Sequence, residues 1–149
     1  HDDTTLEHVE QAIADRISIA EFPTTIEAAT ALHAAGIRVM MGAPNLVRGG
    51  SHSGNIATAE LAGSGLLDIL SSDYVPSSLL AAAVNMPTLV RGIDLASAIR
   101  TVTKTPAEAV GLSDRGEIVA GKRADLIRVH QRHDVPAVRA VWRAGERVA

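Results

Sequence analysis

The chain contains no cysteine among its 149 residues, so disulfides and thiolate metal sites are excluded. Aromatic side chains are scarce, since Phe22, Tyr74 and Trp142 are the complete set, and this argues against stacking on nucleic-acid bases. The net charge is −3, without the basic excess that a nucleic-acid partner requires. No apolar run approaches the ~20 residues that span a bilayer, and no signal peptide is recognisable. We therefore expect a cytoplasmic protein with neither nucleic acid nor membrane as a partner.

Apolar residues make up 46% of the chain, and the length is sufficient for one domain with a hydrophobic core. In the first 90 residues, helical periodicity alternates with short apolar runs. Thr4 with Glu7, and Thr24 with Glu27, have the spacing of helix capping boxes. The pattern predicts helices over 4–16, 24–36, 56–62 and 75–86, and strands over 17–22, 37–42 and 66–73. Such alternation indicates an α/β fold with a parallel sheet covered by helices.

The pattern changes after residue 92. Residues 94–112 predict one helix and a short second helix interrupted at Pro106. Short β segments separated by glycine turns follow over 114–129 and 137–149, and residues 130–134 are expected to form an exposed turn. We predict two parts: a partial α/β barrel that carries the functional site over 1–112, and a C-terminal β segment over 113–149.

The predicted strands end in residues that have no obvious role in packing. Functional groups of α/β folds lie at the carboxyl ends of parallel strands. Asp73 follows the third strand, where it could bind a metal or accept a proton from water, or could simply cap the next helix. His1 precedes the first helix, where it could ligate a metal if a strand lies upstream. Alternatively, Asp2 and Asp3 only favour the start of that helix.

The segment "MGAPNLVRGGSHSGN", residues 41–55, is rich in glycine and in hydrogen-bond donors. Exposed amides, an arginine and the start of the next helix could converge on an anion. His52 could instead ligate a metal or move a proton, and the segment could also be an ordinary flexible loop. We expect phosphate binding by Arg48, Gly49, Gly50, Ser51, His52, Ser53 and Asn55.

Several segments together resemble the second half of an amidohydrolase-superfamily enzyme: "HDDTT", "AEFPTT", "VMMGAPNLVRGGSHSGN", "LLDILSSDYVP" and "TKTPAEAVGLSDRGEIVAGKRADLIRV". The resemblance implies the C-terminal part of a (β/α)8 TIM barrel, about strands five to eight, with a small C-terminal β-sandwich segment. It also implies a metal-dependent hydrolase of phosphonate catabolism. Its substrate would be a phosphorylated ribose phosphonate, whose 5-triphosphate is hydrolysed with release of pyrophosphate.

The same resemblance implies roles for individual residues. His1 matches a strand-five metal ligand, and Asp73 matches a strand-eight aspartate that binds metal and handles the proton of the attacking water. Glu21 falls where many relatives place a histidine ligand, so it is a departure from the family pattern. The implied cofactor is a divalent metal ion, with Zn, Mn and Fe as the candidates.

Other departures leave alternatives open. The His-x-His and the bridging lysine that bind metal in this superfamily are absent, and a complete barrel needs about 250 residues. We therefore expect the C-terminal part of a longer protein, inactive alone, that forms a homo-oligomer or assembles with a missing N-terminal half. One alternative is another amidohydrolase reaction, on a cyclic amide or by deamination. Another is a non-catalytic half-barrel module that binds phosphorylated ligands.

Overall fold

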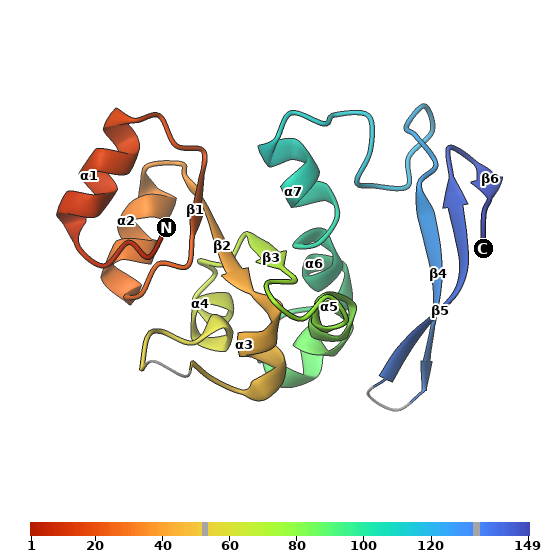
Figure 1. The fold of residues 1–149 in the computed structure, drawn as a ribbon, viewed down its shortest axis with the longest axis horizontal. Helices are drawn as coiled ribbons and strands as arrows, with labels where there is room; N and C mark the ends of the chain where they lie inside the picture. The colour runs from red at the N-terminus through yellow and green to blue at the C-terminus, as the bar shows by residue number, and fades with distance from the viewer. Residues whose placement is uncertain (52–53, 133–134) are drawn as a thin grey trace.

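The computed structural model describes residues 1–51, 54–132 and 135–149 (Figure 1). Its first part is a parallel three-stranded sheet with helices packed against it, and its second part is an antiparallel three-stranded sheet. The mixed α/β character expected from the sequence is confirmed. In chain order the elements are α1 (Leu6–Ala14), β1 (Ile19–Glu21), α2 (Ile26–Ala34), β2 (Arg38–Gly42), α3 (Ala43–Arg48), α4 (Thr58–Gly63), β3 (Ile69–Ser71), α5 (Ser78–Leu89), α6 (Leu95–Arg100), α7 (Lys104–Ala109), β4 (Leu126–Arg132), β5 (Val135–Arg143) and β6 (Glu146–Arg147).

The parallel strands lie in the order β1-β2-β3, as expected when successive βα units pair with their neighbours. Glu21 pairs with Met40, and Gly42 pairs with Ser71, so the carboxyl ends of the strands meet at one edge. The first residues of the chain extend this edge, because the amide of Asp2 donates to the carbonyl of Glu21 at 2.9 Å. The register thus brings the residues that follow β1, β2 and β3 to the same end of the parallel sheet.

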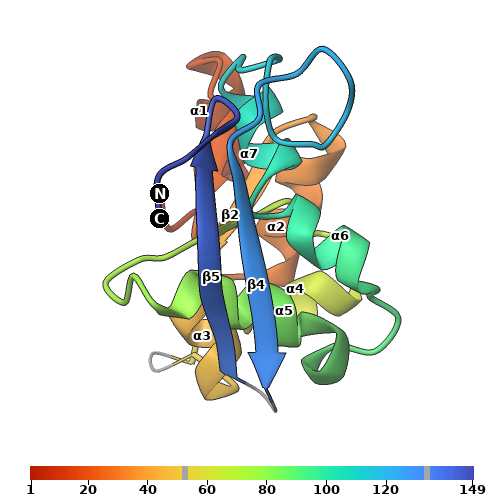
Figure 2. The same ribbon diagram turned by 90° about the vertical axis from the view of Figure 1, so that its right-hand side faces the viewer.

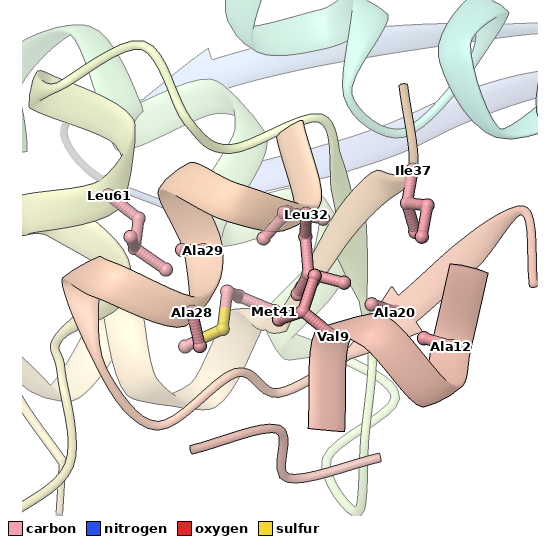
Figure 3. Close-up of a cluster of buried hydrophobic side chains, with 10 residues drawn as sticks. Val9, Ala12, Ala20, Ala28, Ala29, Leu32, Ile37, Met41 and Leu61 are labelled. Atoms are coloured by element: carbon pink, nitrogen blue, oxygen red, sulfur yellow. The ribbon is translucent and has the colours of Figure 1, made fainter. Parts of the chain in front are cut away.

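The core of this part lies between α1, α2 and the sheet (Figure 3). Leu32, Val39 and Leu61 are completely buried there, and small alanines such as Ala28 and Ala29 let the helix approach the strands closely. In Figure 3, Val9 and Leu32 point toward Met41 from two different helices. None of the helices in the described ranges is both long and apolar enough to cross a membrane.

Asp68 fixes the amino ends of the strands. Its side chain is only 9% exposed and accepts a hydrogen bond from Arg38 Nη1 at 2.9 Å. Its second carboxylate oxygen accepts from the amide of Val39, also at 2.9 Å. Both partners belong to β2, so this carboxylate ties β2 to the start of β3. Polar contacts therefore hold β2 and β3 together at their amino ends, opposite the carboxyl ends that meet near Gly42.

The first two helices begin one residue later than the capping boxes predicted. Thr5 and Thr25 are the N-caps, and their hydroxyls accept from the amides of His8 and Ala28. The hydroxyls of Thr4 and Thr24, which were expected to cap, instead bond each other at 2.7 Å. This pairing joins the two segments that surround β1.

The second sheet is antiparallel, and β4 and β5 lie beside α5 in both views (Figures 1 and 2). Residues 130–132, expected in a turn, belong to β4, whereas 133–134 lie outside the described residues. The ladder is irregular between Arg128 and Val129, where a β-bulge interrupts the pairing. The described residues form one sheet here, so the β-sandwich and the boundary at residues 112–113 stay predictions.

Three charged side chains, those of Glu117, Lys104 and Lys122, join α7 to the segment that leads to the second sheet, and we call this ion-pair cluster the clasp. Glu117 lies 2.6 Å from the Lys104 ammonium of α7 and 2.6 Å from that of Lys122. The hydrogen bond from Lys104, followed by that from Lys122, lowers the pKa of Glu117 to about 2. Because the clasp is partly exposed, salt will screen it.

This clasp predicts a pH dependence of stability. A carboxylate whose pKa is lowered by folding stabilises the fold above its unfolded pKa near 4.5, and this contribution is lost as pH falls toward about 2. Glu117→Gln should lower the urea midpoint at pH 7, and the difference from wild type should shrink steadily below pH 4.5. Glu10→Gln, at an exposed position of α1, is the control and should change neither the midpoint nor its pH dependence. A difference that is equal at pH 7 and pH 3 would contradict the clasp.

Candidate active site

A cavity of about 200 Å³ opens where the carboxyl ends of the parallel strands meet. Residues that follow β1, β2 and β3 all contribute to it, together with the start of the chain. Its lining includes five of the eight described residues expected from the sequence: Arg48, Gly50, Ser51, Asn55 and Asp73. It also includes residues that the sequence did not single out: Asp2, Phe22, Gly42, Asn45 and Tyr74. Asp73 therefore shares one cavity with the glycine-rich segment, as the anion-site hypothesis requires. His52 and Ser53 lie outside the described residues.

Gly42 gives the cavity its shape because it lacks a side chain. A Cβ at this position would lie 3.0 Å from Asp73 Oδ2 and 3.3 Å from Phe22 Cε1. The Asp73 carboxylate and the Phe22 ring thus pack directly over the end of β2. Since Ser77 occupies the N-cap position of α5, the alternative role of Asp73 as the cap of that helix is wrong.

The backbone around the cavity is strained. Asp2, Phe22 and Asp73 have φ angles of 60°, 58° and 50°, a left-handed conformation that is costly for residues other than glycine. Each such residue costs on the order of 1 kcal/mol, and such residues concentrate at functional sites. The Phe22 amide is held by the Met40 carbonyl at 2.9 Å, so pairing with the sheet helps to maintain the conformation.

The segment expected to be an open loop begins with a short helix, α3. Leu46 of this helix is 2% exposed, so the segment contributes to the core after all. Gly49, with φ 81°, ends the helix, and its amide donates to the Leu46 carbonyl at 3.2 Å. The Gly50 amide donates to the Asn45 carbonyl at 3.1 Å. The expectation that these two amides point at an anion is therefore wrong, because both complete the helix end.

Asn45, which sequence reasoning missed, holds both ends of the following loop. Its carbonyl accepts from Gly50, and its side-chain Oδ1 accepts from the amide of Thr58 at 2.9 Å. The first amide of α4 is thus already bonded and does not point at an open anion site as expected. The described residues 51 and 54–57 lie between these two bonded positions. Asn45 also lines the cavity, so its hydrogen bonds to Gly50 and Thr58 position a residue of the cavity wall.

Arg48 and Tyr74 form a second tie across the cavity. Arg48 Nη1 donates a hydrogen bond to the Tyr74 hydroxyl, which joins α3 to the segment between β3 and α5. Both side chains are exposed, Tyr74 by 63%. Arg48 forms no ion pair within residues 1–51, 54–132 and 135–149. The sequence motifs did not assign a role to Tyr74 either, although its place directly after Asp73 in "SSDYVP" is a signal that could have identified it.

His1 lies beside the cavity rather than in its lining. Its Nδ1 contacts Asp2 Oδ2 at 2.6 Å, its Nε2 is 3.7 Å from Glu21 Oε2, and its ring meets Phe22 edge-on. The part of the chain that the structure describes holds no group of three or more histidine or carboxylate side chains suited to a metal ion. The expected ligands His1, Glu21 and Asp73 are therefore not gathered into one set, and their metal role stays a prediction.

Residues 2–149 match the sequence model of the amidohydrolase family, and the chain therefore belongs to that family. The similarity expected from the sequence motifs is confirmed. A relative from Escherichia coli (strain K12), alpha-D-ribose 1-methylphosphonate 5-triphosphate diphosphatase, is 53% identical over 149 residues. The alignment covers 99% of this chain and 39% of that relative, so the chain spans about two fifths of its length.

Two solved structures have a similar fold. One is an uncharacterized protein with a TM-score of 0.68 and 19% identity, which covers 97% of this chain and 44% of the other. The second is an amidohydrolase from Thermotoga maritima MSB8 with a TM-score of 0.57 and 15% identity, which covers 89% of this chain and 43% of the other. At these identities they show the fold alone. The assignment of β1–β3 to particular barrel strands stays a prediction.

The close approach at Gly42 predicts a specific sensitivity. Gly42→Ala should lower the free energy of unfolding by about 1–3 kcal/mol, because the new methyl group must displace the Asp73 carboxylate or the Phe22 ring. Gly50→Ala is the matched control, since its Cβ would meet nothing within 4 Å, and its change should stay within about 0.5 kcal/mol. Urea unfolding measures both. Equal stability of the two variants would show that the packing over Gly42 is loose.

Proposed function

We propose that this chain carries the phosphate-binding rim of a hydrolase acting on alpha-D-ribose 1-methylphosphonate 5-triphosphate. The similarity to the Escherichia coli diphosphatase supports this substrate. The observation that carries the proposal is the single cavity shared by Asp73, Arg48 and the polar residues Ser51 and Asn55. A polyanionic substrate needs a cation and several hydrogen-bond donors beside the group that handles the proton.

The proposed reaction hydrolyses the bond between the α- and β-phosphates. Water attacks the α-phosphorus, a new P–O bond forms, and the bridging oxygen leaves with pyrophosphate. Asp73 accepts the proton of the attacking water. Arg48 pairs with phosphate oxygens, and Ser51 and Asn55 contribute donors to the same anion. The products are the 5-phosphate of the ribose phosphonate and pyrophosphate.

Amidohydrolases generally use divalent metals, and such an ion would polarise phosphate oxygens and make a bound water more acidic. His1, Glu21 and Asp73 are the side chains that this chain would offer to Zn, Mn or Fe. Because they do not form a group of three within the described ranges, they would supply only part of a coordination sphere. The roles proposed for Arg48 and Asp73 do not depend on that ion.

A second candidate is a non-catalytic module that binds phosphorylated ligands. The lack of a three-residue metal set within the described residues favours it. Metal analysis of the purified protein separates the two: bound metal that is lost in Asp73→Asn supports the enzyme, and a folded, metal-free protein that still binds pyrophosphate supports the module.

The uncompensated Arg48 argues against a cyclic-amide substrate, which carries little charge.

Arg48→Met should lower kcat/KM for pyrophosphate release from the 5-triphosphate by about 100-fold, because a charge-assisted contact with phosphate is lost. The measurement is coupled detection of pyrophosphate with the natural full-length chain. Arg91→Met removes an exposed arginine that does not line the cavity and should leave the rate within about twofold. Equal losses in both variants would exclude a specific phosphate contact at Arg48.

Asp73→Asn should lower kcat by about 10²–10⁴-fold, because the amide cannot accept the proton of the attacking water. Glu21→Gln should cost less than about tenfold, since Glu21 lies outside the cavity lining. The same assay ranks the two variants, and urea unfolding confirms that both fold. The reverse ranking would place the proton acceptor at Glu21 and overturn the role of Asp73.

A further inference from the structure

The guanidinium of Arg48 has a neutral partner although two carboxylates line the same cavity. Yet within the described residues the side-chain hydrogen bond of Arg48 is with the Tyr74 hydroxyl, and not with Asp2 or Asp73. A hydroxyl satisfies one of the five N–H donors of an arginine and leaves its charge uncompensated. An ion pair with Asp73 would instead neutralise both groups. The partner of Arg48 therefore decides whether the cavity keeps a free cation.

We propose that Tyr74 is a positioning residue that holds Arg48 for the pyrophosphate portion of the substrate, and this inference rests on the proposed function. The Tyr74 hydroxyl fixes one edge of the guanidinium, so that the remaining donors face an incoming phosphate. It also keeps Arg48 from pairing with Asp73. The exposed position of both side chains places this contact on the solvent side of the cavity, whereas Gly42, beneath the Asp73 carboxylate, is buried.

The chain geometry explains how one tyrosine can serve both neighbours. Asp73 has a left-handed backbone, and Tyr74 follows it directly, so the position of the tyrosine is tied to that of the carboxylate. Arg48 is the last residue of α3, just before the turn at Gly49. The hydrogen bond thus joins the end of α3 to the residue beside the proton acceptor. Substrate phosphate held by Arg48 would be registered against Asp73.

The test is steady-state kinetics of Tyr74→Phe in the natural full-length chain. This change removes the hydroxyl and keeps the ring. KM for the 5-triphosphate and the inhibition constant of inorganic pyrophosphate should each rise about five- to tenfold, with kcat within about twofold, as expected when a binding contact is weakened. The double variant Arg48→Met/Tyr74→Phe should match Arg48→Met alone, because Tyr74 acts through Arg48.

Three results would overturn the inference: unchanged KM and inhibition constant in Tyr74→Phe, multiplication of the two single effects in the double variant, or a fall in kcat with KM unchanged. A purely structural role would instead lower the urea midpoint of Tyr74→Phe, which we expect to be unchanged. If the wild-type protein releases no pyrophosphate, the proposed function fails separately. Calorimetric binding of inorganic pyrophosphate to the same four proteins then decides the role of Tyr74 by the same pattern.

Discussion

The parallel register of β1, β2 and β3 is the constraint on which the rest of the structure depends. Pairing of Glu21 with Met40, and of Gly42 with Ser71, brings three successive strand ends to one edge. Residues far apart in the chain then line one cavity. A shift of one residue in any strand would turn its side chains to the other face and separate these groups. Asp68 holds the register from the opposite edge.

The polar side chains of the cavity lie beside backbone positions with positive φ angles. The carboxylate of Asp73 rests on a bare glycine, and its own φ angle is positive, as are those of Phe22 and Asp2. Backbone hydrogen bonds join Asp2 to Glu21 and Phe22 to Met40, and Asp73 lies close over Gly42, so the surrounding structure maintains these conformations. The strand ends therefore position the residues that line the cavity, which favours precise placement of the groups proposed to react.

The alternation of helices and strands could be predicted because each has a hydrophobic period of its own, and the place of Asp73 at a strand end followed from it. Other features depend on contacts between distant residues. The need for Gly42 arises from Asp73, which follows the neighbouring strand β3, and Tyr74 meets Arg48 across 26 residues of chain. Helix α3 is only six residues long, too short for periodicity to reveal beside so many glycines.

Asn45 bonds the chain at two positions, Gly50 and Thr58, so the ends of the segment are fixed independently of the side chains between them. Between these two positions, the Ile56 amide donates to the Thr24 carbonyl at 3.0 Å. Lengthening such a segment carries only a slowly growing entropic cost. Side chains at described positions such as Ser51 and Asn55 could therefore be exchanged with less effect on the strands beneath than Ile56, which packs against the core. The loop is a natural place for relatives to diverge in the molecules they accept, and for selection of altered specificity in the laboratory.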